Sequence, residues 1–123
     1  MKIAFVELQG FSSVREEHFG GDETFRQLQL WLTNNPKLAP VIPGTGGLRK
    51  ARWADPSKGT GKRGGLRVIY LFIEEVSMIV LFNVYSKNVV TDLTPEQKRA
   101  AAKYARSIRE YFAVWKIESD QNE

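Results

Sequence analysis

Two long apolar segments with a short gap between them constrain the fold of this chain more than any other feature. The first, residues 66–73 (LRVIYLFI), is apolar at nearly every position, as in a strand whose two faces are both covered. A short acidic stretch, residues 74–77 (EEVS), separates it from a second apolar segment, residues 78–85 (MIVLFNVY). We therefore expect two long strands within a sheet that helices cover.

The sequence before these segments predicts one strand followed by two helices. Residues 2–7 are β-prone. Ser13 begins a sequence that resembles a capping box, so we expect the first helix to begin there and to end before Gly20. Asp22 can cap a second helix, whose apolar residues line one face until Pro36 ends it.

A further strand and a long helix complete the chain. Residues 48–54 read as a strand that precedes the two apolar segments. Thr94, Pro95 and Gln97 predict the start of a helix, with Thr94 as the cap, Pro95 at the first helical position and Gln97 at the third. We expect this helix to run to about Lys116 and to pack through an apolar stripe formed by Ala101, Tyr104, Ala105, Ile108, Phe112 and Trp115.

The resulting order, β-α-α-β-β-β-α, predicts an α+β fold. It would have a small, mostly antiparallel sheet, two helices near the N-terminus and one helix at the C-terminus. The length of 123 residues fits one domain, which we expect over residues 1–117, with a polar tail over residues 118–123.

Composition argues against several kinds of functional site. The chain has no cysteine and only one histidine, His18, so we expect neither a metal centre nor a cofactor. No charged leader with a long apolar segment precedes the first predicted strand. No apolar run reaches the roughly 20 residues that a membrane span needs. We therefore expect a cytoplasmic protein without a membrane partner.

Positive charge is concentrated in one glycine-rich segment. Residues 44–67 carry seven lysines and arginines against one acid, Asp55, so the net charge of this segment exceeds the +4 of the whole chain. The remainder of the protein is slightly acidic, and the charge therefore forms a patch. A patch of this kind predicts a polyanionic partner, RNA above all.

The alternation of a strand gives the first of these cations a direction. Lys50 and Arg52 are two residues apart and project from one face, whereas Arg49, Ala51 and Trp53 project from the other. Ala51 and Trp53 are the apolar pair and are expected to face the core. We therefore place Lys50 and Arg52 on the open surface.

Two further cations are expected nearby. Arg67 begins the next strand and Lys87 follows the last one, so both can join Lys50 and Arg52 on one concave face. Such a set can neutralise a phosphodiester and the extra charge of its transition state. Arginine offers phosphate a planar fork, whereas lysine loses its proton more readily, so Lys50 is the better candidate for a general base.

The residues by themselves leave three interpretations open. Strand lysines and arginines most often form a solvated face or cross-strand ion pairs. Nucleic-acid binding without catalysis and phosphodiester cleavage are the other two. Residues 59–63 (GTGKR) do not form a phosphate-binding P-loop, because they lack its spacing and precede a strand. Tyr85 and Trp53 adjoin the cations and can either stack on a base or pack in the protein.

Three motifs follow one another along the chain: residues 43–52 (PGTGGLRKAR), residues 61–70 (GKRGGLRVIY) and residues 85–88 (YSKN), the last followed by residues 92–94 (DLT). In this order they resemble the motifs of HigB-type toxins of the RelE/ParE superfamily. The resemblance covers about residues 1–115, and the fold of that superfamily has the element order expected above.

The resemblance implies the toxin of a bacterial type II toxin–antitoxin pair, a metal-independent endoribonuclease that cleaves mRNA on the translating ribosome. It implies attack of a 2′-hydroxyl on the adjacent phosphate, with a catalytic set of Lys50, Arg52, Arg67 and Lys87. The expected partners are mRNA, ribosomal RNA and a small helix-turn-helix antitoxin. Contacts to RNA and the ribosome are expected from Arg49, Lys58, Lys62, Arg63 and Tyr85.

Two alternatives to the ribonuclease remain. The ParE branch shares the fold, inhibits gyrase and does not need these cations, so their retention favours the ribonuclease. A gyrase-inhibiting toxin without nuclease activity is therefore one alternative, and a basic RNA-binding module is the other.

Overall fold

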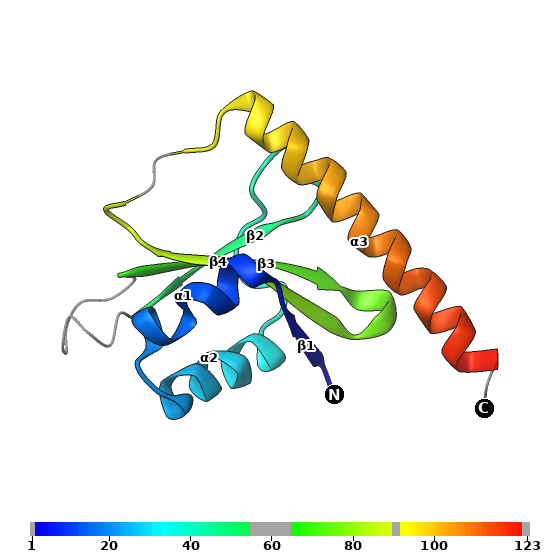
Figure 1. Cartoon of the computed structure of the whole chain (residues 1–123), viewed down its shortest axis with the longest axis horizontal. Helices are drawn as coiled ribbons and strands as arrows, with labels where there is room; N and C mark the ends of the chain where they lie inside the picture. Colours follow the sequence, from blue (N-terminus) through cyan, green and yellow to red (C-terminus); the bar gives the residue numbers. More distant parts are fainter. Residues whose placement is uncertain (1, 55–64, 90–91, 122–123) are drawn as a thin grey trace.

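A four-stranded sheet lies between two helices on one face and a third helix on the other (Figure 1). The computed structural model describes residues 2–54, 65–89 and 92–121. The elements are β1 (Ala4–Glu7), α1 (Gln9–Phe19), α2 (Asp22–Asn34), β2 (Arg49–Trp53), β3 (Leu66–Ile73), the 3-10 turn η2 (Glu74–Val76), β4 (Met78–Ser86) and α3 (Pro95–Gln121). The α+β class and the order of elements predicted from the sequence are confirmed.

The sheet is mostly antiparallel and has the strand order β1-β4-β3-β2. Strand β3 pairs antiparallel with both β2 and β4, whereas β1 runs parallel to β4 at the edge of the sheet. The two apolar segments form the central pair of strands. They are joined through η2 and Ser77, whose left-handed backbone has φ of 50°.

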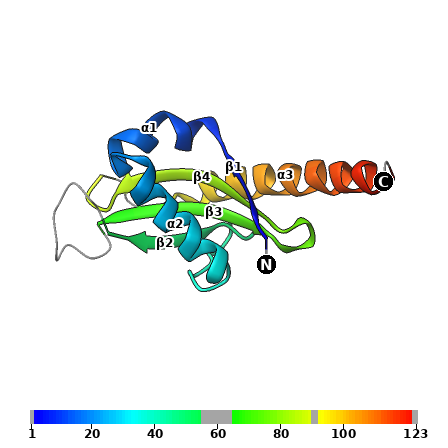
Figure 2. The same ribbon diagram turned by 90° about the horizontal axis from the view of Figure 1, so that it is seen from below.

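Each face of the sheet has its own apolar core, because apolar side chains on β3 alternate between the faces. Val68 and Tyr70 are fully buried among side chains of α1 and α2. Leu71 and Ile73 are buried in a second cluster that includes two residues of α3, Ala105 and Ile108. Figure 2 shows α1 and α2 in front of the sheet and α3 behind it.

Helix α1 begins earlier than the sequence pattern predicts. It starts at Gln9, and the Ser13 hydroxyl donates to the carbonyl oxygen of Gly10 at 3.3 Å within the helix. The predicted start at Ser13 was wrong because Phe11 must lie on the helix to reach the core, where it is fully buried. The helix ends before Gly20, as predicted, and this glycine is left-handed with φ of 73°.

Helix α2 has the predicted extent with a different cap. Gly21 is the N-cap residue, and no side chain caps this end, so Asp22 is the first residue of the helix and not its cap. A carboxylate in the first turn still complements the positive end of the helix dipole. The helix ends at Asn34, shortly before Pro36, as the sequence predicts.

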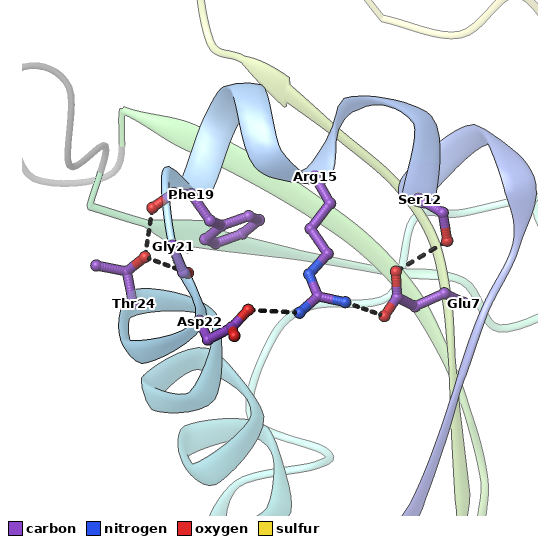
Figure 3. A network of polar contacts seen from close by, with 7 residues as sticks. All are labelled: Glu7, Ser12, Arg15, Phe19, Gly21, Asp22 and Thr24. Atoms are coloured by element: carbon purple, nitrogen blue, oxygen red, sulfur yellow. Dashed lines mark hydrogen bonds and ion pairs between the residues drawn. The ribbon is translucent and has the colours of Figure 1, made fainter.

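A polar network ties β1, α1 and α2 together (Figure 3). Arg15 Nη1 donates to Glu7 Oε2 at 2.8 Å, and Arg15 Nη2 lies 3.5 Å from Asp22 Oδ1. The Ser12 hydroxyl donates to the other Glu7 carboxylate oxygen at 2.9 Å. The Arg15 guanidinium also stacks 3.9 Å from the centre of the Phe25 ring. Arg15 is thus a cation that both acids and an aromatic ring hold in place.

Helix α3 starts as predicted and runs further. Thr94 Oγ1 accepts from the backbone N–H of Gln97 at 3.1 Å, and the Gln97 side chain accepts from the backbone N–H of Thr94 at 2.9 Å, which is a complete capping box. The helix continues beyond Lys116 to Gln121, where the pair of Lys116 and Asp120, 3.4 Å apart, supports the last turn.

The predicted packing stripe of α3 is buried only in its middle. Ala105 and Ile108 are buried, whereas Tyr104 is 50% exposed and Trp115 is 47% exposed. Tyr104 lies before the buried pair and contacts Phe82 of the sheet, with ring centres 5.7 Å apart. For the later residues the reason is visible in Figure 2, where the C-terminal end of α3 extends past the end of the sheet. The later part of the stripe therefore has no sheet beneath it.

The first glycine motif anchors α3. Gly44, Gly46 and Gly47 all have positive φ, and a side chain at Gly46 would come within 3.2 Å of the Ala102 backbone. The Arg109 guanidinium donates to the Gly46 carbonyl oxygen at 3.3 Å. Residues 44–47 therefore form a seat for the helix, a role that charge and glycine content alone did not predict.

Candidate functional site

Arg52, Arg67 and Tyr85 form a row across β2, β3 and β4, here called the cross-strand row. In the strand register Arg52 lies opposite Arg67, and Arg67 lies opposite Tyr85. Residues directly opposite each other share one face of a sheet. Ile69, two positions further along β3, packs in the core beneath α3, so the row lies on the α3 side of the sheet.

Lys50 and Lys87 lie beside this row. Lys50 precedes Arg52 by two positions on β2 and so projects from the same face. Lys87 follows β4, and its backbone N–H donates to the carbonyl oxygen of Gly65 at 3.0 Å, which brings it to the end of the sheet where Arg67 lies. The structure thus gathers at one end of the sheet the four cations singled out from the sequence.

Like charges face each other across the first two strands of the row. Arg52 and Arg67 are directly opposed, so two guanidinium groups are presented from facing positions on one side of the sheet. In the described parts of the chain, Lys50, Arg52 and Lys87 form no ion pair with an acidic side chain. Arg67 donates to the carbonyl oxygen of Leu66 at 3.2 Å. This arrangement suits an anionic ligand with more than one charged group.

Tyr85 completes the row with an aromatic ring and a protonated hydroxyl. Burial raises the pKa of Tyr85 above its ordinary value of 10.0, Arg67 lowers it and Asp92 raises it further, with a net upward shift. The hydroxyl therefore stays protonated at neutral pH. Tyr85 can donate a hydrogen bond or stack on a base, but it does not supply a phenolate base.

Two other residues near the cations have roles within the protein. Arg49, on the opposite face, donates through Nη1 to the carbonyl oxygens of Lys37 at 3.0 Å and Ala39 at 2.7 Å, which fixes the segment beside β2. Trp53 packs against Trp31 with ring centres 5.8 Å apart. Arg49 and Trp53 therefore stabilise the packing around β2 and lie apart from the cross-strand row.

The loop cations Lys58, Lys62 and Arg63 lie outside the described residues. Their expected contact with ribosomal RNA stays a prediction.

A pocket of about 590 Å³ adjoins the row. Its apolar walls come from the segment 40–43, from the strands and from the start of α3, and its polar lining consists of Lys50, Asn83, Tyr85, Asp92 and Lys98. The sequence pointed to Lys50 and Tyr85 but missed Asn83 and Lys98, because only the folding of α3 over the sheet brings them together. Asp92 belongs to a motif of the resemblance, a signal that could have found it.

Comparisons with known proteins identify the fold. No family model matches the chain. A doubly substituted variant of the E. coli toxin RelE in the free state is 12% identical, with a TM-score of 0.49, and the match covers 70% of this chain and 84% of that chain. A chain of the intact E. coli RelBE toxin–antitoxin complex is 13% identical, with a TM-score of 0.50, and the match covers 69% of this chain and 96% of that one.

The chain has a RelE-like fold. On this fold the cross-strand row lies on the sheet, and the pocket lies between the sheet and α3. Over residues 2–54, 65–89 and 92–121, no cluster of three histidine or acidic residues could hold a metal ion. Over the same ranges, no helix is long and apolar enough to cross a bilayer.

Proposed function

We propose that this protein is the HigB-type toxin of a bacterial type II toxin–antitoxin pair and that it cleaves mRNA on the translating ribosome. The observation that carries the proposal is the direct opposition of Arg52 and Arg67 on a RelE-like sheet. Two guanidinium groups at facing positions can each offer the oxygens of one phosphodiester a planar pair of donors. The protein acts in the bacterial cytoplasm, where its ribosomal substrate is found.

The proposed reaction is an internal transesterification of RNA. The 2′-oxygen attacks the adjacent phosphorus, the bond from phosphorus to the 5′-oxygen breaks, and the products are a 2′,3′-cyclic phosphate and a 5′-hydroxyl. Arg52 and Arg67 bind the phosphate oxygens and stabilise the charge that develops on them. Lys50, as a neutral amine, takes the proton from the 2′-hydroxyl, and Lys87, the remaining cation of the set, gives a proton to the departing 5′-oxygen.

Two kinds of partner follow from the proposal. Ribosomal RNA would contact the basic residues that follow β2 in the sequence, namely Lys58, Lys62 and Arg63. A helix-turn-helix antitoxin would neutralise the toxin. A chain of the similar fold comes from a toxin–antitoxin complex, which supports an antitoxin partner for this chain.

The test is controlled expression of the protein in bacteria, followed by mapping of mRNA 5′ ends. We expect growth arrest and new ends within codons of translated messages, and little cleavage of the same RNA without ribosomes. Intact mRNA with gyrase-dependent DNA breaks would instead identify a ParE-like toxin. Unaffected growth with soluble, folded protein would leave only a basic RNA-binding module.

A further inference from the structure

A β-bulge in β4 shapes the pocket beside the cross-strand row. Ile69 pairs with Asn83 and Tyr70 pairs with Leu81, so Phe82 has no residue opposite it on β3. Phe82 packs in the core beneath α3, with its ring 5.7 Å from that of Tyr104. The bulge lets Phe82 and its neighbour Asn83 both line the pocket, although adjacent strand residues normally face opposite sides.

The pocket has the size and the lining of a site for a flat organic group. Its volume of about 590 Å³ lies within the range of small-molecule sites and is ample for a base with its sugar. Ile42, Leu48, Ile69 and Phe82 supply apolar walls, and Tyr85 is shared with the cross-strand row. A strand whose phosphate lies on the row would therefore have a base within reach of the pocket.

The polar groups of the pocket are mostly hydrogen-bond donors. The side-chain oxygen of Asn83, Oδ1, accepts from the backbone N–H of Val84 at 2.9 Å, which fixes the orientation of the side-chain amide and leaves its NH₂ group as the donor. Lys98 adds an ammonium donor and Tyr85 a hydroxyl donor, and Asp92 is the one carboxylate in the lining. The pocket therefore offers several donors and one strong acceptor.

This combination matches guanine better than the other bases. Guanine presents two neighbouring acceptors, O6 and N7, together with the donors N1–H and N2–H₂, whereas adenine has a donor in place of O6. Cytosine and uracil present no such pair of adjacent acceptors with two donors beside it. We propose that the pocket binds a guanine base of the RNA strand whose phosphate lies on the cross-strand row. This inference rests on the proposed function for its substrate class.

The first test is binding of mononucleotides to the intact isolated protein, followed by NMR of the Asn83 side-chain amide. We expect GMP to bind about fivefold more tightly than AMP, CMP or UMP, because GMP would form one additional hydrogen bond of typical strength with the pocket. Asn83→Ala should remove this preference, and Asn34→Ala, at an exposed position on α2, should keep it. Equal binding of all four nucleotides to the wild-type protein would overturn the proposal, even if Asn83→Ala failed to fold.

The second test uses the mapped mRNA ends from induced cells. Guanine should be enriched within one nucleotide of the cut, and Asn83→Ala should lower that enrichment about fivefold. Cleavage without any guanine preference would contradict guanine binding in the pocket and would still support the proposed ribonuclease activity. Selective binding of GMP by a protein that leaves mRNA intact would support the pocket and contradict the ribonuclease. The two hypotheses therefore fail in distinguishable ways.

Discussion

The two faces of the sheet use arginine in opposite ways. On the α1–α2 face, Arg15 lies between Glu7 and Asp22 and over the ring of Phe25, so the protein itself neutralises the cation. On the α3 face, Arg52 and Arg67 oppose each other across two strands. The first arrangement stabilises the fold at the junction of three elements. The second presents two guanidinium groups on one face of the sheet and suits an anionic ligand.

The largest expected effect comes from removing a cation of the cross-strand row. Arg67→Ala should slow mRNA cleavage on programmed ribosomes about 100-fold, because one lost transition-state donor costs about that much. The free energy of unfolding should change by less than about 1 kcal/mol, because Arg67 is partly exposed and belongs to neither apolar core. Arg26→Ala, at an exposed position on α2, is the matched control and should change neither quantity. An unchanged rate of mRNA cleavage by folded Arg67→Ala protein would contradict the catalytic role assigned to Arg67.

The opposite result is expected for Arg15. Arg15→Ala should lower the free energy of unfolding by about 2 kcal/mol in urea titrations, through loss of a charge-assisted hydrogen bond and of the contact with Phe25. Cleavage per folded molecule should not change. Asp22→Ala is the control: its carboxylate is 95% exposed and 3.5 Å from Arg15, so the loss of this ion pair and of its effect on the dipole of α2 should be under about 1 kcal/mol. A cleavage defect in Arg15→Ala would contradict the division between the faces.

A smaller effect tests how the α3 face is built. Gly46 and Gly20 have nearly equal φ, 72° and 73°, but only Gly46 has a helix backbone close to its missing side chain. Each change to alanine should cost about 1 kcal/mol for the left-handed backbone. Gly46→Ala should cost about 1 kcal/mol more, because overpacking against Ala102 displaces α3. If Gly46→Ala and Gly20→Ala lost equal stability in thermal unfolding, the packing of Gly46 against α3 would have to be less tight than the contact of 3.2 Å implies.

The smallest effect concerns a tyrosine on the α1–α2 face. Burial raises the pKa of Tyr70, although Arg49 partly offsets this, and its hydroxyl donates to the Pro36 carbonyl oxygen at 2.9 Å. The unfolded chain releases this proton near pH 10, whereas the folded protein holds it to higher pH. Stability should therefore fall as the pH rises above 10, by up to about 1 kcal/mol per pH unit.

Tyr70→Phe isolates this contribution from other groups that titrate in the same range. The variant should be less stable at neutral pH, through loss of the hydrogen bond to Pro36, and should show a shallower decline above pH 10. Parallel curves of unfolding free energy against pH for the variant and the wild type would contradict the assignment.

Much of the fold could be predicted from local patterns. The apolar runs of β3 and β4, the capping box of α3 and the glycine after α1 each depend on a few neighbouring residues, and all lie where the sequence places them. The start of α1 could not be predicted in this way. A tertiary requirement, the burial of Phe11, outweighs the capping signal at Ser13.

The candidate site, too, could be predicted only where it depends on local sequence patterns. Strand alternation was enough to put Lys50 and Arg52 on one face. The opposition of Arg67 to Tyr85 depends on the register of β3 and β4, and the place of Asn83 depends on a bulge between them. The sequence places Gly44, Gly46 and Gly47 only in the basic, glycine-rich segment, whereas in the structure they lie against α3. Their role depends on Ala102 and Arg109, which lie far along the chain.

The pairing of β1 has a consequence for when a newly made chain becomes active. This first strand to be synthesised pairs with β4, the last one, and β4 also supplies Tyr85 to the cross-strand row. The pocket further requires Lys98 from α3. Neither the complete cross-strand row nor the pocket can form while the final third of the chain is still inside the ribosome. A protein proposed to attack translating ribosomes is thus inert during its own synthesis, and the ribosome that makes it can finish the chain.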